Sequence, residues 1–369
     1  MKIAIIGCGS IAAAHLAAIK KNHPGSRIYL MDTARKAAES LASKWGVDGI
    51  YDNLDLMFSK VNPDAVHVLT PPPTHFAIAK QALEAGCHVL VEKPVTETAG
   101  EFIILSSLAK TKNRLIAVDY SLLGMPVVQK AIREIKSGNL GRLISVHCNF
   151  ACSWPGNKIP YQNPRHWAYD LKGGVLQNMV DHPTSLVLAI MDPIEEHRIL
   201  FARRNVLPND CPDLLEVMVC NQDQVGSFTL SLAHGNAERR AYLLLEGGSI
   251  MIDMGRQLSF FTRGKGPQNF IKKTLSGFSE GLALTSGMIK NIFGVIAGRL
   301  GRDPGVAHVI DNFYKTIKGK EELLIGNDSA LAITRLLESI WNQTARSRIR
   351  VGSNSRESEA DFLMLEGRQ

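Results

Sequence analysis

A lysine with unusual chemical scope stands at Lys93, within the sequence Glu92-Lys93-Pro94. It follows an apolar run, residues 88–91, of the kind that forms a buried parallel strand. In an open α/β sheet, ligands bind beyond the carboxyl ends of the strands. A lysine there carries a positive charge and can also lose a proton. Beside a nicotinamide it could hold a substrate hydroxyl and manage its proton, so this motif predicts hydride transfer.

A dinucleotide site is predicted near the N-terminus. Gly7 permits a tight turn, Gly9 lets a pyrophosphate approach the backbone, and Ala12 is small enough for the next helix to pack on the first strand. Asp32 ends the second expected strand, at the distance where an acidic side chain accepts the ribose hydroxyls of NAD(H). The predicted cofactor contacts in this part of the chain are Gly7, Gly9, Ser10, Ile11 and Asp32.

Two basic residues leave NADP(H) open as the cofactor. Arg35 and Lys36 follow Asp32 and could reach a 2′-phosphate, although an acidic side chain at position 32 would repel one. The favoured interpretation of both residues is ordinary solvation at the start of a helix.

A proline-rich run leaves another expected buried strand. Proline has no N–H to donate and holds the chain stiff and extended, which suits a wall of the adenine–ribose channel. The alternative is a turn that simply ends the strand. The run is Thr70-Pro71-Pro72-Pro73-Thr74-His75, and we expect Thr70, Pro71, Pro72 and His75 to contact the cofactor, together with Glu92 and Lys93.

The glycine loop, the proline run and Val91-Glu92-Lys93-Pro94 together resemble the glucose-fructose oxidoreductase / inositol dehydrogenase / rhizopine-catabolism (Gfo/Idh/MocA) family. The resemblance is dense in the N-terminal domain and sparser after it. It implies a Rossmann domain joined to an open-faced α/β domain, and oxidation or reduction of a sugar or cyclitol carbon. It also implies that Lys93 is the catalytic lysine and that the Lys93-Pro94 bond is cis.

The same resemblance implies a second catalytic element at residues 173–182. His182 fills the family's histidine position, but Asn178 stands where an Asp is expected. If this stretch is helical, residues 178 and 182 share a face, whereas Asp181 points away. A histidine near the reacting hydroxyl can act as general base, typically worth ~10²–10⁴-fold. An amide cannot stabilise the resulting imidazolium as a carboxylate would.

The Asn178 substitution has three explanations. Lys93 carries the proton, Asn178 binds a sugar hydroxyl, or the protein has lost activity, and we favour the first two combined. A loop of aromatic and basic residues before Gly173 could stack on a sugar ring or hold a diphosphate, or it could merely be anchored by its own rings. The predicted substrate contacts are Trp154, Tyr161, Arg165, Trp167, Asn178 and His182. The arginine that the family often has near residue 119 is absent, because this chain has Asp119 there.

Strand and helix patterns alternate up to residue 121, which predicts a parallel Rossmann sheet covered on both faces. From there the apolar period becomes two, which predicts an α+β domain with a largely antiparallel, open-faced sheet. We therefore expect a cofactor domain at 1–121, a substrate and oligomerisation domain at 122–350, and a flexible tail at 351–369. The other face of this sheet is rich in Ser and Thr and is either solvated or a subunit contact, and we expect a homo-dimer or homo-tetramer formed through it.

An insert within the second domain, residues 264–305, is apolar but interrupted by Lys290, Arg299 and several glycines. It is too broken for a membrane span. Its basic flanks permit a helix that lies on anionic lipid. The favoured interpretation is a loop–helix segment packed on its own domain.

Composition bounds these hypotheses. The chain has 369 residues, and its net charge of +7 favours anionic ligands only mildly. Its basic residues are dispersed and carry no nucleic-acid-binding motif. The six cysteines have no zinc spacing, so no metal is expected, and they fit a reducing cytoplasm.

The leading hypothesis is an NAD(P)-dependent oxidoreductase acting on a carbinol or keto carbon of a sugar, nucleotide sugar or cyclitol. Two other classes stay open. One is an NAD-dependent glycosidase that oxidises a sugar carbon transiently, and the other is a non-catalytic NAD(P)-binding regulator.

Overall fold

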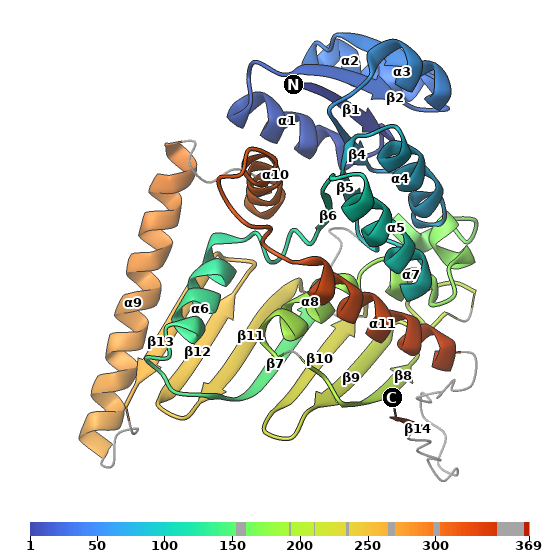
Figure 1. Cartoon of the computed structure of the whole chain (residues 1–369). Helices are drawn as coiled ribbons and strands as arrows, with labels where there is room; N and C mark the ends of the chain where they lie inside the picture. The colour runs from blue at the N-terminus through green and yellow to red at the C-terminus, as the bar shows by residue number, and fades with distance from the viewer. Residues whose placement is uncertain are drawn as a thin grey trace. The chain divides into compact units, whose positions relative to one another are not determined.

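The computed structural model describes residues 1–152, 160–191, 193–209, 211–233, 236–264, 270–297, 303–344 and 365–368. The chain divides into two compact units (Figure 1). The first unit holds Met1–Gly124 and Asp303–Glu338, and the second holds Met125–Arg302 and Ser339–Gln369. Each unit is built around one sheet.

The first unit contains a six-stranded sheet in the order β3-β2-β1-β4-β5-β6, and every neighbouring pair is parallel. This is the strand order of a dinucleotide-binding fold, with its switch point between β1 and β4. The strands are β1 (Lys2–Ile6), β2 (Arg27–Met31), β3 (Gly49–Tyr51), β4 (Ala65–Val68), β5 (His88–Glu92) and β6 (Ile116–Asp119). The crossover helices are α1 (Ala12–Asn22), α2 (Arg35–Trp45), α3 (Leu54–Val61), α4 (His75–Glu84) and α5 (Ala99–Thr111).

The Rossmann prediction is confirmed, and its apolar strands explain why. All four residues of β4 are buried, and β1 and β5 are apolar and buried along most of their length, as expected when helices cover both faces of a sheet. The short pair β3 and α3 was not predicted, because three half-buried residues give no strand signal.

The first unit also takes in a segment from late in the chain. Helix α10 (Pro304–Ile317) packs along α1, and its Ile310 and Phe313 join the core that contains Ile3 and Leu16. Helix α11 (Asn327–Thr344) begins in the same unit. This division differs from the single domain that we expected at 122–350. The apolar period of α10 shows that one face is buried, but not which sheet it covers.

The second unit is an eight-stranded sheet in the order β13-β12-β11-β7-β10-β9-β8-β14. Only β7 and β10 pair in parallel among the described strands, so the predicted largely antiparallel sheet is confirmed. The first four strands in chain order are β7 (Leu143–Ala151), β8 (Glu196–Ala202), β9 (Leu214–Cys220) and β10 (Val225–Ser231). The others are β11 (Glu238–Leu245), β12 (Gly248–Asp253), β13 (Leu258–Arg263) and β14 (Leu365–Arg368).

Helices cover one face of this sheet (Figure 1). Helix α6 (Pro126–Lys136) packs on β12 and β13, and α8 (Asp181–Ile190) packs on β7 and β10. Burial alternates along β7, β9 and β11, so the opposite face is open. Strand β14 falls within the tail expected to be flexible and pairs with β8, while the rest of 351–369 lies outside the described residues.

The insert forms one long helix, α9 (Phe270–Ile296), which contacts β13. No helix in the described part of the chain is long and apolar enough to cross a membrane. All six cysteines are unbridged.

Candidate cofactor and catalytic sites

The glycine loop after β1 shows why two glycines are needed for different reasons. Gly7 has a φ of +97°, and a Cβ there would lie 2.7 Å from the backbone of Leu69 at the end of β4. A Cβ on Gly9 would meet nothing within 4 Å. Gly9 and Ser10 are exposed just before α1, so the loop offers open backbone at the start of a helix. This opening fits the pyrophosphate of a dinucleotide.

Asp32 fastens this loop to the end of β2. One carboxylate oxygen accepts a hydrogen bond from the Cys8 N–H at 2.7 Å, and the other accepts one from the Ala34 N–H at 2.8 Å. Each oxygen keeps a second lone pair, and the side chain is only partly buried, so it can also accept ribose hydroxyls. Arg35 pairs with Glu39 at 3.0 Å and with Asp52 at 3.4 Å. The residues present therefore fit NAD.

His75 has a structural role that the sequence did not indicate. Its ring is buried, with Nδ1 2.8 Å from the Pro94 carbonyl oxygen and Nε2 2.6 Å from the Thr70 carbonyl oxygen. Burial lowers the pKa of His75, although both carbonyls oppose the shift. The neutral ring donates to only one carbonyl at a time. His75 thus joins the proline run to the segment after Lys93, and Pro72 is buried beside it.

Lys93 follows β5 directly, in the same unit as the glycine loop. The Lys93-Pro94 peptide bond is cis, as the resemblance implied. The Lys93 N–H donates to Glu92 Oε2 at 3.1 Å. Lys93 itself is half-buried at the carboxyl edge of the sheet. This is where a lysine must stand to act on a ligand bound along that edge.

A buried polar chain runs beneath this edge and was missed at the sequence level. His15 on α1 places Nε2 3.2 Å from Asp119 Oδ2 and 3.6 Å from Glu92 Oε1. Its Nδ1 lies 2.8 Å from Nδ1 of His67 on β4. Nε2 of His67 lies 2.7 Å from the hydroxyl of Tyr314 on α10. Five elements of the first unit therefore contribute one side chain each.

The charges within this group of buried polar side chains favour one pattern of protonation. Burial alone would lower the pKa of His15, but Asp119 and Glu92 outweigh it and raise that pKa to about 9. Burial raises the pKa of Asp119 to about 6. Burial also opposes ionisation of Glu92, yet His15 and the charge of Lys93 prevail and lower its pKa. Burial and the charge on His15 lower the pKa of His67 well below its usual value.

The raised pKa of His15 and the lowered pKa of His67 favour one direction for these hydrogen bonds. His15 is an imidazolium that donates from Nδ1 to a neutral His67, and His67 then donates from Nε2 to the Tyr314 oxygen. His15, Glu92 and Asp119 are also a donor set that could hold a cation, the one such group among the described residues. The imidazolium already lies at ion-pair distance from both carboxylates, so we interpret the cluster as an ion-pair network.

One sequence signal could have revealed this network. His67 interrupts the otherwise apolar Ala65–Val68, and a polar side chain in a strand buried on both faces needs a partner. Asp119 had been noted only for the missing arginine. Its partner His15 lies 104 positions away in the sequence and becomes identifiable only once the strand order is known.

In the second unit, the glycine pair before the histidine is explained by packing. A Cβ on Gly173 would come within 2.2 Å of the Trp341 ring. Gly174 has a φ of +57°, and its Cβ would lie 2.6 Å from the sulfur of Cys211. These close approaches start the short helix α7 (Gly174–Gln177).

The expected helix through 178–182 is interrupted. Helix α7 ends at Gln177 and α8 begins at Asp181, with a turn between them, so a shared helix face for residues 178 and 182 is not supported. Asn178 Nδ2 donates to the Tyr161 hydroxyl at 2.9 Å. His182 is half-buried and stacks on Phe150, with ring centroids 5.3 Å apart.

The aromatic loop is partly self-anchored. Tyr161 is buried and packs edge-on against His166, which lies beside Trp167. Burial raises the pKa of Tyr161. Arg165 and Trp167 are exposed, while Trp154 lies outside the described residues. The structure therefore brings Tyr161 together with Asn178 and leaves the substrate roles of this loop as predictions.

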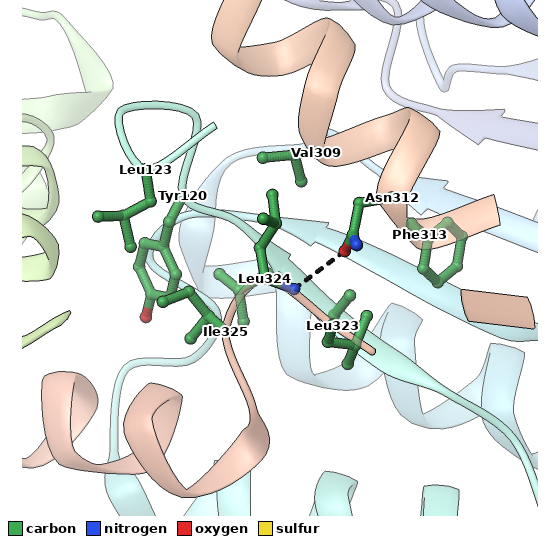
Figure 2. Close-up of a pocket in the computed structure, with 10 residues that line it drawn as sticks. Tyr120, Leu123, Val309, Asn312, Phe313, Leu323, Leu324 and Ile325 are labelled. Carbon is green, nitrogen blue, oxygen red and sulfur yellow. Dashed lines mark hydrogen bonds between the residues drawn. The ribbon is translucent and has the colours of Figure 1, made fainter. Parts of the chain in front are cut away.

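A small pocket of the first unit is not the cofactor site. It lies between the end of β6, α10 and residues 323–325 (Figure 2). Figure 2 shows Asn312 accepting a hydrogen bond from the Leu324 N–H at 2.9 Å. The lining is largely apolar and includes no residue of the glycine loop.

Comparisons with known proteins agree with this architecture. Residues 1–120 match the model of an oxidoreductase family with an NAD-binding Rossmann fold. Residues 128–251 match the GFO/IDH/MocA C-terminal domain. The fold and the glycine loop thus define an NAD-binding oxidoreductase-type protein. The chain belongs to the Gfo/Idh/MocA family.

Similar curated proteins include sugar and cyclitol dehydrogenases. D-glucoside 3-dehydrogenase of Escherichia coli K12 is 28% identical over 144 residues, which cover 39% of this chain and 41% of that protein. Inositol 2-dehydrogenase of Rhodococcus erythropolis is 32% identical over 151 residues, covering 40% and 43%. The chain thus spans about half the length of the curated relatives it matches, or less.

Solved structures share the whole fold. The WlbA dehydrogenase from Bordetella pertussis, in complex with NADH and UDP-GlcNAcA, has a TM-score of 0.76 at 19% identity, covering 94% of this chain and 95% of that one. A levoglucosan dehydrogenase in complex with NADH and levoglucosan has a TM-score of 0.74 at 18% identity, covering 94% and 97%. At these identities the likeness establishes the fold.

Proposed function

We propose that this chain is an NAD-dependent dehydrogenase that transfers hydride between nicotinamide and a CH–OH carbon of a sugar or nucleotide sugar. One observation carries the proposal: a lysine follows β5 at the carboxyl edge of a sheet whose switch point holds an open glycine loop. Bound nicotinamide supplies the acceptor or donor of the hydride. The remaining chemistry belongs to this chain's own side chains.

Lys93 has the main role in proton transfer. Its ammonium can donate a hydrogen bond to the substrate oxygen, and the neutral amine can receive that oxygen's proton as the carbinol is oxidised. Glu92 keeps a negative charge at the base of the lysine, because the His15 imidazolium compensates its burial. The Pro94 segment, next to Lys93, is held in place by His75.

His182 is the second predicted proton carrier, and Asn178 supports it less than an Asp would. The Asn178 amide donates to Tyr161, so in this chain it fixes the aromatic loop. Without a carboxylate at position 178, an imidazolium on His182 lacks that partner's charge. We infer that Lys93 bears most of the proton transfer and that His182 orients the substrate hydroxyl.

The substrate class rests on named relatives and on charge. D-glucoside 3-dehydrogenase and inositol 2-dehydrogenase are among the similar proteins, and a fold neighbour is described with UDP-GlcNAcA. The exposed Arg165 and Trp167 suit a diphosphate and a sugar ring. The net charge of +7 favours an anionic ligand only mildly.

The test is NADH formation from NAD⁺ with a panel of nucleotide sugars, glycosides and cyclitols. We expect turnover with at least one member, and a loss of kcat of roughly 10²-fold or more in Lys93→Met, the scale of a lost proton-transfer group. Lys44→Met, at an exposed lysine on α2, is the matched control and should leave kcat unchanged.

Two outcomes would replace the proposal. Tight NAD binding without turnover of any substrate would favour a regulator. Bond cleavage of a glycoside with NAD retained and no net NADH would favour the glycosidase. Equal activity of Lys93→Met and wild type would remove Lys93 from the mechanism.

We also propose that the open face of the second sheet joins two copies of the chain. Tyr242, His147, Ser227 and Met218 lie opposite one another on four neighbouring strands. The exposed apolar residues on these strands are Ile144, Met218, Val225, Tyr242 and Leu244.

A further inference from the structure

Helix α9 contacts its own unit through a side on which three of the four less exposed described residues are small or polar. The less exposed described positions are Leu284, Gly287, Asn291 and Gly294, which recur at helical spacing on one side. A Cβ on Gly287 would lie 2.7 Å from the Leu258 side chain at the start of β13. Asn291 Nδ2 donates to the carbonyls of Arg256 and Gln257 at 2.8 and 2.9 Å. The helix is therefore fixed on the sheet by its weakly apolar side.

The opposite side of α9 is strongly apolar and faces outward. At 100° per residue, six of the large exposed apolar side chains share one stripe, and Phe270, Met288 and Val295 lie to one side of it. Phe278 is 73% exposed and Ile296 is 76% exposed, one at each end of this stripe. Its described members are Phe278, Leu282, Ile289, Ile292, Phe293 and Ile296. A helix of a globular domain normally buries such a face, so α9 has the reverse arrangement.

Positive charge is concentrated in α9 and in the residues on either side of it. Residues 264–302 contain six basic residues and one acidic residue, a net charge of +5 against +7 for the whole chain. The basic residues are Lys265, Lys272, Lys273, Lys290, Arg299 and Arg302, and the acidic one is Glu280. Lys290 is exposed beside the apolar stripe. A second copy of this segment would meet it with like charge, whereas an anionic surface would be complementary.

We propose that α9 docks the protein on a membrane surface containing anionic lipid, with its apolar stripe between the headgroups and Lys290 near the phosphates. The helix is about 40 Å long from its 27 residues, and it would lie in the plane of the interface. This mode agrees with the finding that no described helix can cross a bilayer. The rest of the second unit, to which α9 is fixed through β13, stays outside the lipid.

Co-sedimentation of the full chain with vesicles tests the proposal. The vesicles contain phosphatidylcholine with or without about 30% phosphatidylglycerol, a proportion that gives a negative surface. We expect binding to the anionic vesicles, weak binding to pure phosphatidylcholine, and release at high salt, because exposed charge pairs are screened.

Two variants test whether lipid binding depends on the apolar stripe of α9 or is a nonspecific property of exposed apolar residues. Ile289→Glu should weaken binding roughly tenfold or more by placing a charge in the inserted face. Ile104→Glu on α5 is the matched control, because Ile104 is 50% exposed and Ile289 is 49% exposed, and it should bind like wild type. Circular dichroism and NADH binding in the absence of lipid confirm that both variants fold.

Three results would overturn the proposal: no sedimentation with anionic vesicles, equal binding to both vesicle types, or unchanged binding of Ile289→Glu. A fourth would assign the stripe to a second copy, namely a change of oligomeric state in Ile289→Glu, by light scattering, with no lipid binding in wild type.

Discussion

The ion pairs of His15 with Glu92 and Asp119 set the charge beside Lys93. Glu92 and Asp119 lie at the ends of neighbouring strands and would repel each other if His15 were neutral. Removing a buried counter-charge leaves carboxylates in a medium that cannot solvate them. His15 is fully buried, so we expect it to act through Glu92, by holding that carboxylate in position and compensating its charge.

Replacing His15 with Gln should lower the free energy of unfolding by about 3 kcal/mol at neutral pH, the scale of a broken buried pair. The pKa of His15 in the folded state is raised to about 9. Its stabilisation is therefore complete below the ordinary histidine pKa and is lost as pH rises through about 9. The gap between wild type and His15→Gln should narrow over that range, as measured by urea unfolding.

The control for this measurement is His23→Gln, just after the same helix. His23 lies 3.6 Å from Asp311, but burial and nearby lysines lower its pKa. The difference in the free energy of unfolding between wild type and His23→Gln should therefore stay constant from neutral pH to about pH 9. A gap for His15→Gln that stays constant over this range would contradict the imidazolium assignment.

At the residue scale, local motifs could be predicted and long-range partners could not. Gly7, Asp32 and Lys93 are each marked by their neighbours in the sequence, and the structure places all three in the first unit. The partners of His15 come from β5 and β6, and they become neighbours only through the parallel strand order. The role of Asn178 depended on an assumed continuous helix, which the turn before α8 interrupts.

At the element scale, we expect substitutions at the two glycines of the loop to affect different properties, folding in one case and cofactor binding in the other. Gly7→Ala should destabilise the fold by at least about 2 kcal/mol, because a Cβ is strained at positive φ and would also meet the Leu69 backbone. Gly9→Ala should fold with near wild-type stability, since its Cβ meets nothing. It should still weaken NADH binding, because the methyl group would occupy the approach of the pyrophosphate.

Urea unfolding and NADH fluorescence titration measure the two effects separately. If both alanine variants lost stability equally, the opening at Gly9 would not be the cofactor's approach.

Elements differed in how well the sequence predicted them. The alternation of strands and helices in the N-terminal part of the first unit was predicted, apart from β3 and α3, because the apolar period of the longer elements is repeated several times. Strands β8 and β13 were missed, since β13 is mostly half-buried and has no clear alternation. Helix α9 was expected as part of an insert. The exposure of its apolar side could not be predicted, because an apolar side gives the same sequence period whether it is buried or exposed.

At the scale of the whole molecule, the open sheet face predicts self-association. Tyr242→Glu should shift the protein toward monomer, because it places a charge in the exposed row. Ile103→Glu on α5 is the control, as Ile103 is 42% exposed and Tyr242 is 46% exposed. Light scattering after size exclusion measures the mass. An unchanged mass for Tyr242→Glu would show that this face is not the contact between copies.

The two apolar surfaces, the sheet face and the α9 stripe, call for different partners. The sheet face mixes apolar side chains with Ser227 and His147, which bond to each other at 2.9 Å, as is typical of a protein interface. The α9 stripe is almost purely apolar and lies in the most basic segment.

The single imidazole of His75 has an evolutionary consequence. The His75 ring contacts both the Thr70 carbonyl and the Pro94 carbonyl. The proline run, which is predicted to contact the cofactor, and the segment after Lys93 therefore depend on the same side chain for their positions. Substitutions in the proline run that adapt it to a different cofactor would therefore also change the position of Lys93 and the rate of turnover. We expect mutations in the two motifs to be epistatic, so that adaptation of one requires a compensating change in the other.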